Sequence, residues 1–223
     1  MHAALPHLRA LRVEERDEAL QIDAATRRNL EIDVATGGRE DASLRALLDT
    51  TMTAMGSRAL RRLLNRPITD VATLRRRYHA VGALADGRRY EGLREVLRGI
   101  GDIERILARV ALRSARPRDL AGLRASLGRL PEVRTALAPF DSPLVQELRD
   151  GIGEHADARG LLEQAIAPEP SPFVRDGGVI ATGYDADLDE LRHIASNTDG
   201  FLLELEARER ERTGIPQLKL GYN

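Results

Sequence analysis

"GDIERILARVALRSA", residues 101–115, carries the clearest helical pattern in the chain and indicates a mainly α-helical fold. Its small and apolar residues recur at steps of three and four, which places them along one side of a helix. They are Ile103, Ile106, Leu107, Val110, Ala111 and Ser114. Charged residues occupy the other side, so the pattern predicts an amphipathic helix that packs against further helices.

Further helices follow the same logic along the first 170 residues. A second amphipathic helix is predicted within 69–87, with Thr69 or Asp70 as its N-cap. Its predicted stripe consists of Val71, Leu74, Tyr78, Val81 and Ala85. Shorter helices are expected near 43–50, 56–65, 89–98, 117–129, 143–152 and 157–167. Prolines stand between these runs, and Pro117 and Pro143 take first helical positions, where proline is tolerated.

The last third of the chain combines a predicted hairpin with a long helix. The stretch "FVRDGGVIATG", residues 173–183, contains two short extended runs joined at Asp176-Gly177-Gly178, which predicts a small β-hairpin. From 185 to 212 the helical pattern is uninterrupted and predicts one helix about 42 Å long. Its apolar seam is Leu188, Leu191, Ala195, Thr198, Leu202 and Leu205. A seam of this length needs a partner helix.

The composition restricts the function classes. A chain of 223 residues that is 42% hydrophobic and 31% charged is typical of a globular protein. The absence of cysteine excludes disulfides, thiolate metal sites and thiol nucleophiles. A net charge of -1 argues against nucleic-acid binding by bulk charge, and 3% aromatic residues argue against base stacking. No stretch predicts a membrane span or a signal peptide, so we expect a cytoplasmic protein with no membrane partner.

Three aspartates after the glycine pair resemble the ligands of a calcium loop, namely Asp185, Asp187 and Asp189. Such a loop needs glycine at its sixth position and a bidentate glutamate at its twelfth. Counted from Asp185, these positions hold Glu190 and Ser196, so the calcium interpretation fails. We interpret the aspartates as the cap and first turn of a helix, where carboxylates are stabilised.

No phosphate-binding loop is present in the sequence. A P-loop requires lysine followed by serine or threonine, but the only lysine, Lys219, precedes a leucine. The glycines Gly177, Gly178 and Gly183 lack the spacing of a dinucleotide-binding fingerprint.

The histidines His2, His7, His79, His155 and His193 are too scattered for zinc-ligand spacing. His193 follows Asp189 by one turn, which favours an ion pair on an exposed face. No serine lies in a nucleophile motif, although a catalytic triad assembled from distant residues stays open. We therefore assign no catalytic, cofactor-binding or metal-binding residue.

The arginines leave two interpretations open. Arg105, Arg109, Arg113, Arg116 and Arg118 could follow a phosphate backbone. Acidic residues alternate with them, so a row of salt bridges between helices is favoured. Near 204–210 we expect ion pairs one turn apart, Glu204 with Arg208 and Glu206 with Arg210, on an exposed helix end.

Five stretches of this chain, taken in order, closely resemble the central part of the bacterial DNA mismatch repair family MutS. They are "IDAATRRNLEI" (22–32), "TAMGSRALRRLL" (53–64), "GDIERILARVALRSARPRDL" (101–120), "VRDGGVIATGYDADLDELR" (174–192) and "ARERERTGIPQLKLGYN" (207–223). One departure is Leu63, where family members often carry tryptophan. Leucine still supplies an apolar side chain there.

The resemblance implies a division into three parts. Residues 1–20 resemble the tail of a connector domain, and 21–212 the first part of a discontinuous core and lever domain, with the long helix as a lever. Residues 213–223 resemble the first, truncated strand of a clamp domain. The chain would then be a piece of a longer protein, and the second half of the core would supply the lever's partner helix.

The resemblance also implies function. The family forms homodimers that bind mismatched double-stranded DNA in an ATP-dependent way and recruit MutL. Its mismatch-contacting Phe-x-Glu motif is absent here, because glutamate follows none of Phe140, Phe173 and Phe201 at the required spacing. ATP and Mg would bind in a C-terminal ATPase domain, so this segment would be a non-enzymatic link. The alternatives are a free-standing helical scaffold that binds proteins and, less favoured, a hydrolase.

Overall fold

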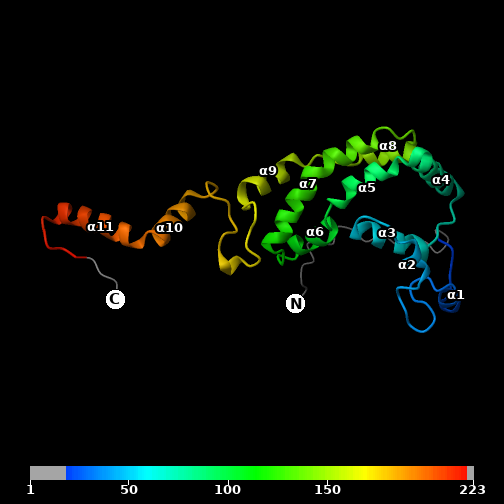
Figure 1. The fold of residues 1–223 in the computed structure, drawn as a ribbon, viewed down its shortest axis with the longest axis horizontal. Coiled ribbons are helices and arrows are strands. Elements are labelled where there is room, and N and C mark those ends of the chain that lie inside the picture. Colours follow the sequence, from blue (N-terminus) through cyan, green and yellow to red (C-terminus); the bar gives the residue numbers. More distant parts are fainter. Residues whose placement is uncertain (1–18, 220–223) are drawn as a thin grey trace, which may run out of the picture. The chain divides into compact units, whose positions relative to one another are not determined.

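The computed structural model describes residues 19–219, with the backbone alone at position 199, and this part of the chain is helical (Figure 1). The α-helices are α1 (Ala24–Asn29), α2 (Leu44–Leu48), α3 (Ala54–Asn65), α4 (Val71–Ala85), α5 (Tyr90–Arg98), α6 (Ile103–Ala111), α7 (Pro117–Leu137), α8 (Pro143–Asp150), α9 (Ala156–Ala165), α10 (Ala186–Ser196) and α11 (Thr198–Thr213). Two short 3₁₀ turns are η2 (Asp86–Arg88) and η3 (Val174–Asp176). The predicted mainly α fold is confirmed.

The chain forms two compact units, one ending at Val179 and the other beginning at Ile180. Within 19–219 the chain has isolated β-bridge residues but no strand, and Ala19 and Ile68 form an antiparallel bridge in the first unit. None of the described helices is both long and apolar enough to cross a membrane.

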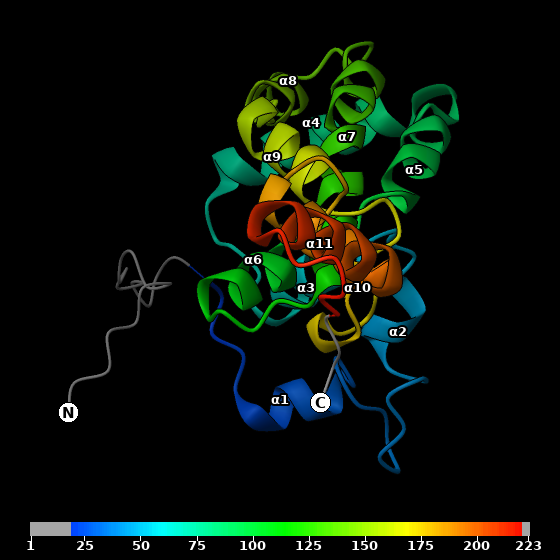
Figure 2. The same ribbon diagram turned by 90° about the vertical axis from the view of Figure 1, so that its left-hand side faces the viewer.

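Helix α7 is the centre of the first unit. It packs against α5, α6, α8 and α9, and Figure 2 shows α5 and α8 on either side of it. Two apolar clusters line it. The larger is built on Ala80, Ile100, Val133, Leu137, Phe140 and Val145, and the smaller on Ile106, Leu123 and Leu127. Both clusters use side chains of α7, so this helix joins them into one core.

Several helix starts match the sequence. Asp70, rather than Thr69, caps α4, because its carboxylate accepts the backbone N–H groups of Ala72 and Thr73, both at 3.1 Å. Pro117 and Pro143 begin α7 and α8 as expected. Each of these starts satisfies or removes backbone N–H groups that a helix leaves unpaired.

Helix α7 is longer than the sequence predicted. We expected a helix over 117–129 that ends before Pro131, yet the helix continues through Pro131 to Leu137. A proline removes one backbone hydrogen bond from a helix interior. Val133 and Leu137 are buried in the larger cluster beyond it, and this packing outweighs the local cost.

The predicted apolar stripes identify helices but not always their buried faces. In α6, Ile106 is buried as expected, but Leu107 is 51% exposed. In α4, Tyr78 is 70% exposed, whereas Ala80 is buried and Leu84 packs against the larger cluster. The face that packs is selected by the neighbouring helices, which the periodicity of one helix does not reveal.

The hairpin predicted at 173–183 is wrong. Residues 174–176 form the 3₁₀ turn η3, and no strand is present among the described residues. Gly177 and Gly178 do adopt positive φ angles of 71° and 67°, as expected for a tight reversal. The extended runs are too short to form a ladder, and the glycines instead let the chain leave η3.

The single long helix predicted at 185–212 is also wrong, since the second unit contains two helices, α10 and α11. Asn197 separates them with φ −133° and ψ 50°, outside the helical region. A Cβ at Gly200 would lie 2.4 Å from the Asn197 side-chain nitrogen, so the glycine makes room for the asparagine. Asparagine and glycine are weak helix formers. The apolar periodicity continues on both sides of Asn197 and therefore did not predict this break.

The remaining predictions concern the ends of the chain. Residues 214–219 contain a turn at 216–217 and no strand, while 220–223 lie outside the described residues. The clamp strand over 213–223 therefore stays a prediction. Residues 1–18 of the predicted connector tail, with His2 and His7, also lie outside the described range.

Candidate functional site

The aspartates after the glycine pair begin a helix, as their spacing in the sequence predicted. Asp185 caps α10 by accepting the Leu188 N–H at 2.9 Å. Asp189 accepts the Gly183 N–H at 2.6 Å and one N–H of Arg192 at 2.9 Å. The structure therefore gives Asp189 a different partner from the expected His193. These contacts fix the turn that leads into the helix.

The favoured salt bridge between helices is found at Arg109. Its Nη1 donates to Asp119 Oδ1 at 2.7 Å and thereby joins α6 to α7. Asp119 also accepts the Arg116 backbone N–H at 2.9 Å. This backbone hydrogen bond, followed by that from Arg109, lowers the pKa of the Asp119 carboxyl. Arg105 makes only a long contact with Asp102, at 3.9 Å.

The other expected ion pairs lie near the end of the second unit. Glu206 and Arg210 form the predicted pair one turn apart, and Arg210 Nε also donates to the Leu218 carbonyl at 2.9 Å. Arg212 pairs with Glu209 at 2.7 Å. The contact between Arg210 and the Leu218 carbonyl attaches the segment after Gly214 to α11.

Within 19–219, the structure shows no cluster of three or more His, Asp or Glu side chains that could hold a metal ion. His79, His155 and His193 belong to α4, the start of α9 and α10, respectively.

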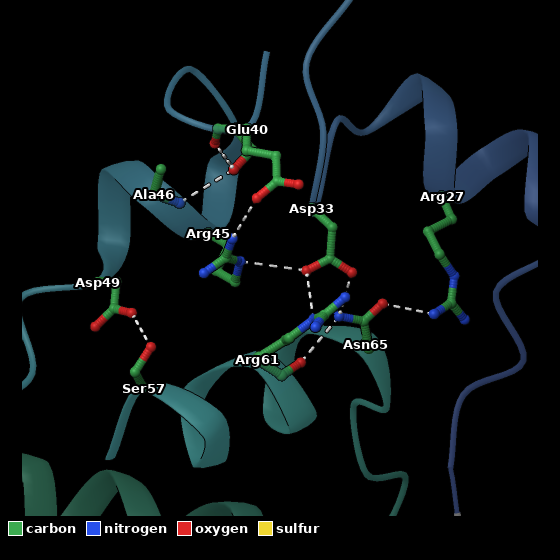
Figure 3. Close-up of polar contacts among 10 residues, drawn as sticks. Arg27, Asp33, Glu40, Arg45, Ala46, Asp49, Ser57, Arg61 and Asn65 are labelled. Carbon is green, nitrogen blue, oxygen red and sulfur yellow. Dashed lines mark hydrogen bonds and ion pairs between the residues drawn. The ribbon is translucent and has the colours of Figure 1, made fainter. Parts of the chain in front are cut away.

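A polar network that sequence reasoning missed joins α1, α2 and α3 around Asp33 (Figure 3). Asp33 Oδ1 accepts from Arg61 Nε at 3.0 Å and lies 3.3 Å from Arg45 Nε. Its Oδ2 accepts from Asn65 Nδ2 at 3.0 Å. Asn65 Oδ1 in turn accepts from Arg27 Nη1 at 2.5 Å. We call these five residues the Asp33 network.

The backbone around Asp33 explains why the network assembles. The N–H groups of Leu44 and Arg45 donate to the carbonyls of Glu31 and Ile32, both at 2.9 Å. These bonds hold the start of α2 against the segment that carries Asp33, and Ile32 is buried beneath it. Arg27 and Arg61 fall within the stretches 22–32 and 53–64, so the resemblance was the signal that could have found these two, whereas Asn65 and Asp33 lie just past the two stretches.

We call an arginine that links two helices, such as Arg109, an arginine clamp. A second arginine clamp, Arg58, joins α3 to the start of α6. Arg58 donates to both oxygens of Asp102, at 2.6 and 2.7 Å, and to Glu104 at 2.6 Å. The Arg58 guanidinium lowers the pKa of the Asp102 carboxyl, and the two carboxylates raise the pKa of Arg58. Asp102 also caps α6 through the Arg105 N–H at 3.2 Å. One carboxylate thus starts a helix and anchors another.

A third clamp joins α7 to the end of α9. Arg124 donates to the carbonyls of Ile166 at 2.6 Å and Pro168 at 2.8 Å, and to that of Ala167 at 3.2 Å. These carbonyls belong to the residues that directly follow the helix. Arg124 therefore satisfies them and places a positive charge beside the C-terminus of α9, which suits the helix dipole.

These features describe an all-helical core whose polar side chains hold its helices together. Residues 25–216 match the family model of MutS domain III, which covers most of the chain. The chain therefore belongs to the MutS family and is part of a DNA mismatch repair protein. Membership in this family implies DNA binding in mismatch repair.

Proposed function

We propose that this chain is the mechanical core of a mismatch-recognition protein, coupling its DNA-contacting parts to its ATPase. The observation that carries the proposal is the set of arginine clamps. Arg58 joins α3 to α6, Arg109 joins α6 to α7, and Arg124 joins α7 to the end of α9. A continuous series of packed and charge-paired helices can transmit a displacement without deforming locally.

In this proposal the segment itself is not an enzyme. ATP and Mg bind in a separate domain of a longer protein, of which residues 1–20 are the connector tail and 213–223 the opening of the clamp. The whole protein is a cytoplasmic homodimer that recruits MutL after binding mismatched double-stranded DNA. The family match and the resemblance support these roles.

The test separates coupling from the two activities that are coupled. In a MutS-family protein carrying this core, Arg58→Ala should leave ATP hydrolysis without DNA and mismatch binding without nucleotide close to their normal values. The acceleration of DNA release by ATP should fall several-fold. Arg98→Ala is the control, because among the described residues Arg98 pairs only with Glu95, on its own helix. Unchanged DNA release by ATP in a folded Arg58→Ala protein would contradict the coupling role.

A simpler experiment tests where the activities reside. The 223-residue chain alone should hydrolyse no ATP and should bind a G·T duplex no better than its matched counterpart. A clear preference for the mismatch would refute the assignment of mismatch recognition to other domains.

A further inference from the structure

Two hollows of about 440 and 460 Å³ lie beside the Asp33 network and share Arg27 and Asp33 as lining residues. Arginine dominates the lining, with Arg27, Arg28, Arg58, Arg61 and Arg62 contributing to one or both hollows. Asp33 is the only carboxylate that lines either of them in the described part of the chain. The hollows therefore have an excess of positive charge although the whole chain is nearly neutral.

Two of these arginines are already neutralised. Arg58 pairs with Asp102 and Glu104, and Arg61 pairs with Asp33. Asp33 is itself fully engaged, since one oxygen faces two guanidinium groups and the other accepts from an amide. Its charge is balanced within the network and does not repel an anion in the hollow.

The other three arginines have no carboxylate partner among residues 19–219. Arg27 is half-buried, and in the described part of the chain its side chain contacts only neutral acceptors, the Asn65 amide oxygen at 2.5 Å and the Ile22 carbonyl at 3.4 Å. Arg28 and Arg62 are exposed, and no side-chain contact holds either of them within the described range. A half-buried guanidinium without a counter-ion favours an anion beside it.

The arrangement is selective for one kind of anion. Asn65 holds the Arg27 guanidinium in place, and Asp33 in turn holds Asn65, so a binding group is preorganised before any ligand arrives. Several guanidinium groups around one hollow offer donors from different directions. The oxygens of a tetrahedral phosphate point in several directions and can accept from several guanidinium groups, whereas a single guanidinium group satisfies both oxygens of a planar carboxylate. Among residues 19–219 no aromatic side chain lines either hollow, so a nucleobase would find no stacking surface from this part of the chain.

We propose that Arg27 and Arg62, with Arg28 beside them, form a phosphate-binding site on the face shared by α1 and α3. The phosphate is either a free ion or a phosphodiester of a nucleic-acid backbone, since both present the same oxygens. The site depends on the local charge arrangement and does not require the coupling role proposed above.

The experiment titrates the 223-residue chain with two phosphate probes, a short, fully matched DNA duplex and inorganic pyrophosphate, and with poly-glutamate as a carboxylate comparison. The test variant is Arg27→Gln with Arg62→Gln. The control is Arg88→Gln with Arg98→Gln, which removes the same charge from exposed arginines paired with Glu91 and Glu95. We expect the test variant to lose at least about tenfold in affinity and the control to lose less than about threefold. For the duplex, the slope of log affinity against log salt concentration should also decrease by the amount expected for about two phosphate contacts.

Each outcome decides the proposal. Arginine-dependent binding of the duplex alone assigns a phosphodiester, and arginine-dependent binding of pyrophosphate assigns a free phosphate. Equal binding by test and control variants in both arms overturns the site. Tighter, arginine-dependent binding of poly-glutamate than of either probe also overturns it, because the hollow would then recognise an acidic protein segment. Arg62→Gln alone, at an exposed position outside the Asp33 network, separates lost binding from lost folding.

Discussion

Single arginines hold the helices of this protein together, and their value depends on what they contact. Arg124 and Arg134 both belong to α7. Arg124 donates to backbone carbonyls at the end of α9, whereas Arg134 pairs with Glu154, whose side chain is 74% exposed. Solvent and salt weaken the exposed pair. Water replaces Arg124 poorly at partly buried carbonyls, so the two residues should contribute very differently to stability.

Arg124→Ala should lower the free energy of unfolding by roughly 2 kcal/mol, because several charge-assisted hydrogen bonds are lost and carbonyls are left unpaired. Arg134→Ala, the matched control, should cost less than about 1 kcal/mol. Urea denaturation of both variants measures the difference. Equal costs would mean that the carbonyl contacts of Arg124 add nothing beyond an exposed ion pair.

The Arg58–Asp102 contact makes stability depend on pH. Arg58 lowers the pKa of Asp102 in the folded chain, so folding favours the ionised carboxylate. This contribution is fully present above the pKa of the unfolded chain, about 3.9, and is lost as the pH falls through the lower folded pKa. Asp102→Asn should therefore destabilise the protein at neutral pH and lose less stability on acidification than the parent.

Denaturation curves between neutral and acidic pH check this prediction. Glu104→Gln is the comparison, because Glu104 touches the same guanidinium but is 59% exposed. Its effect at neutral pH should be smaller than that of Asp102→Asn. Parallel pH profiles for Asp102→Asn and the parent would show that the ion pair does not drive the acid sensitivity.

At the scale of helices, breaks and continuations depend on side-chain detail more than on periodicity. α7 passes through Pro131 because its far end is buried, while the helical pattern of 185–212 divides at Asn197 because nothing there outweighs weak local propensity. Local pattern predicted both segments as helical. The local pattern failed at Pro131 and Asn197, where the burial of the neighbouring residues, or its absence, decides whether a helix continues.

Asn197→Ala should extend helical structure between α10 and α11 and stabilise the chain by about 0.5 kcal/mol. Gly200→Ala alone should stabilise little or be destabilising, because its new Cβ meets the Asn197 side chain. In the Asn197→Ala background the same change should be stabilising, so the two effects are not additive. Backbone chemical shifts at 196–198 and thermal melts measure this coupling. Strict additivity would show that the asparagine does not depend on the glycine.

At the scale of the whole chain, the sequence predicted the helical class, most helix positions and the aspartate cap of α10. It did not predict the Asp33 network or the Arg124 clamp. Asp33 and Asn65 are distant in sequence, and Arg124 reaches carbonyls about forty residues further on, at Ile166 and Pro168. Contacts between helices depend on how the helices pack, and α7 fixes that packing through both apolar clusters.

The division into two units leads to a prediction about independent stability. Every buried residue in the described range precedes Ile180, including both apolar clusters and Ile166. A chain that ends at Val179 keeps the Arg124 contacts and the Ala167–Val179 backbone bond of 2.9 Å. It should melt cooperatively within a few degrees of the full chain, because both apolar clusters lie within the first unit.

The matched control for this truncation is a chain that ends at Ala165, which also removes buried Ile166 and the carbonyls that Arg124 holds. It should melt clearly lower than the chain ending at Val179. Differential scanning calorimetry of the three chains measures both steps. If ending the chain at Val179 abolished cooperative melting, the helices α10 and α11 would have to stabilise the first unit, and the two units would not fold independently.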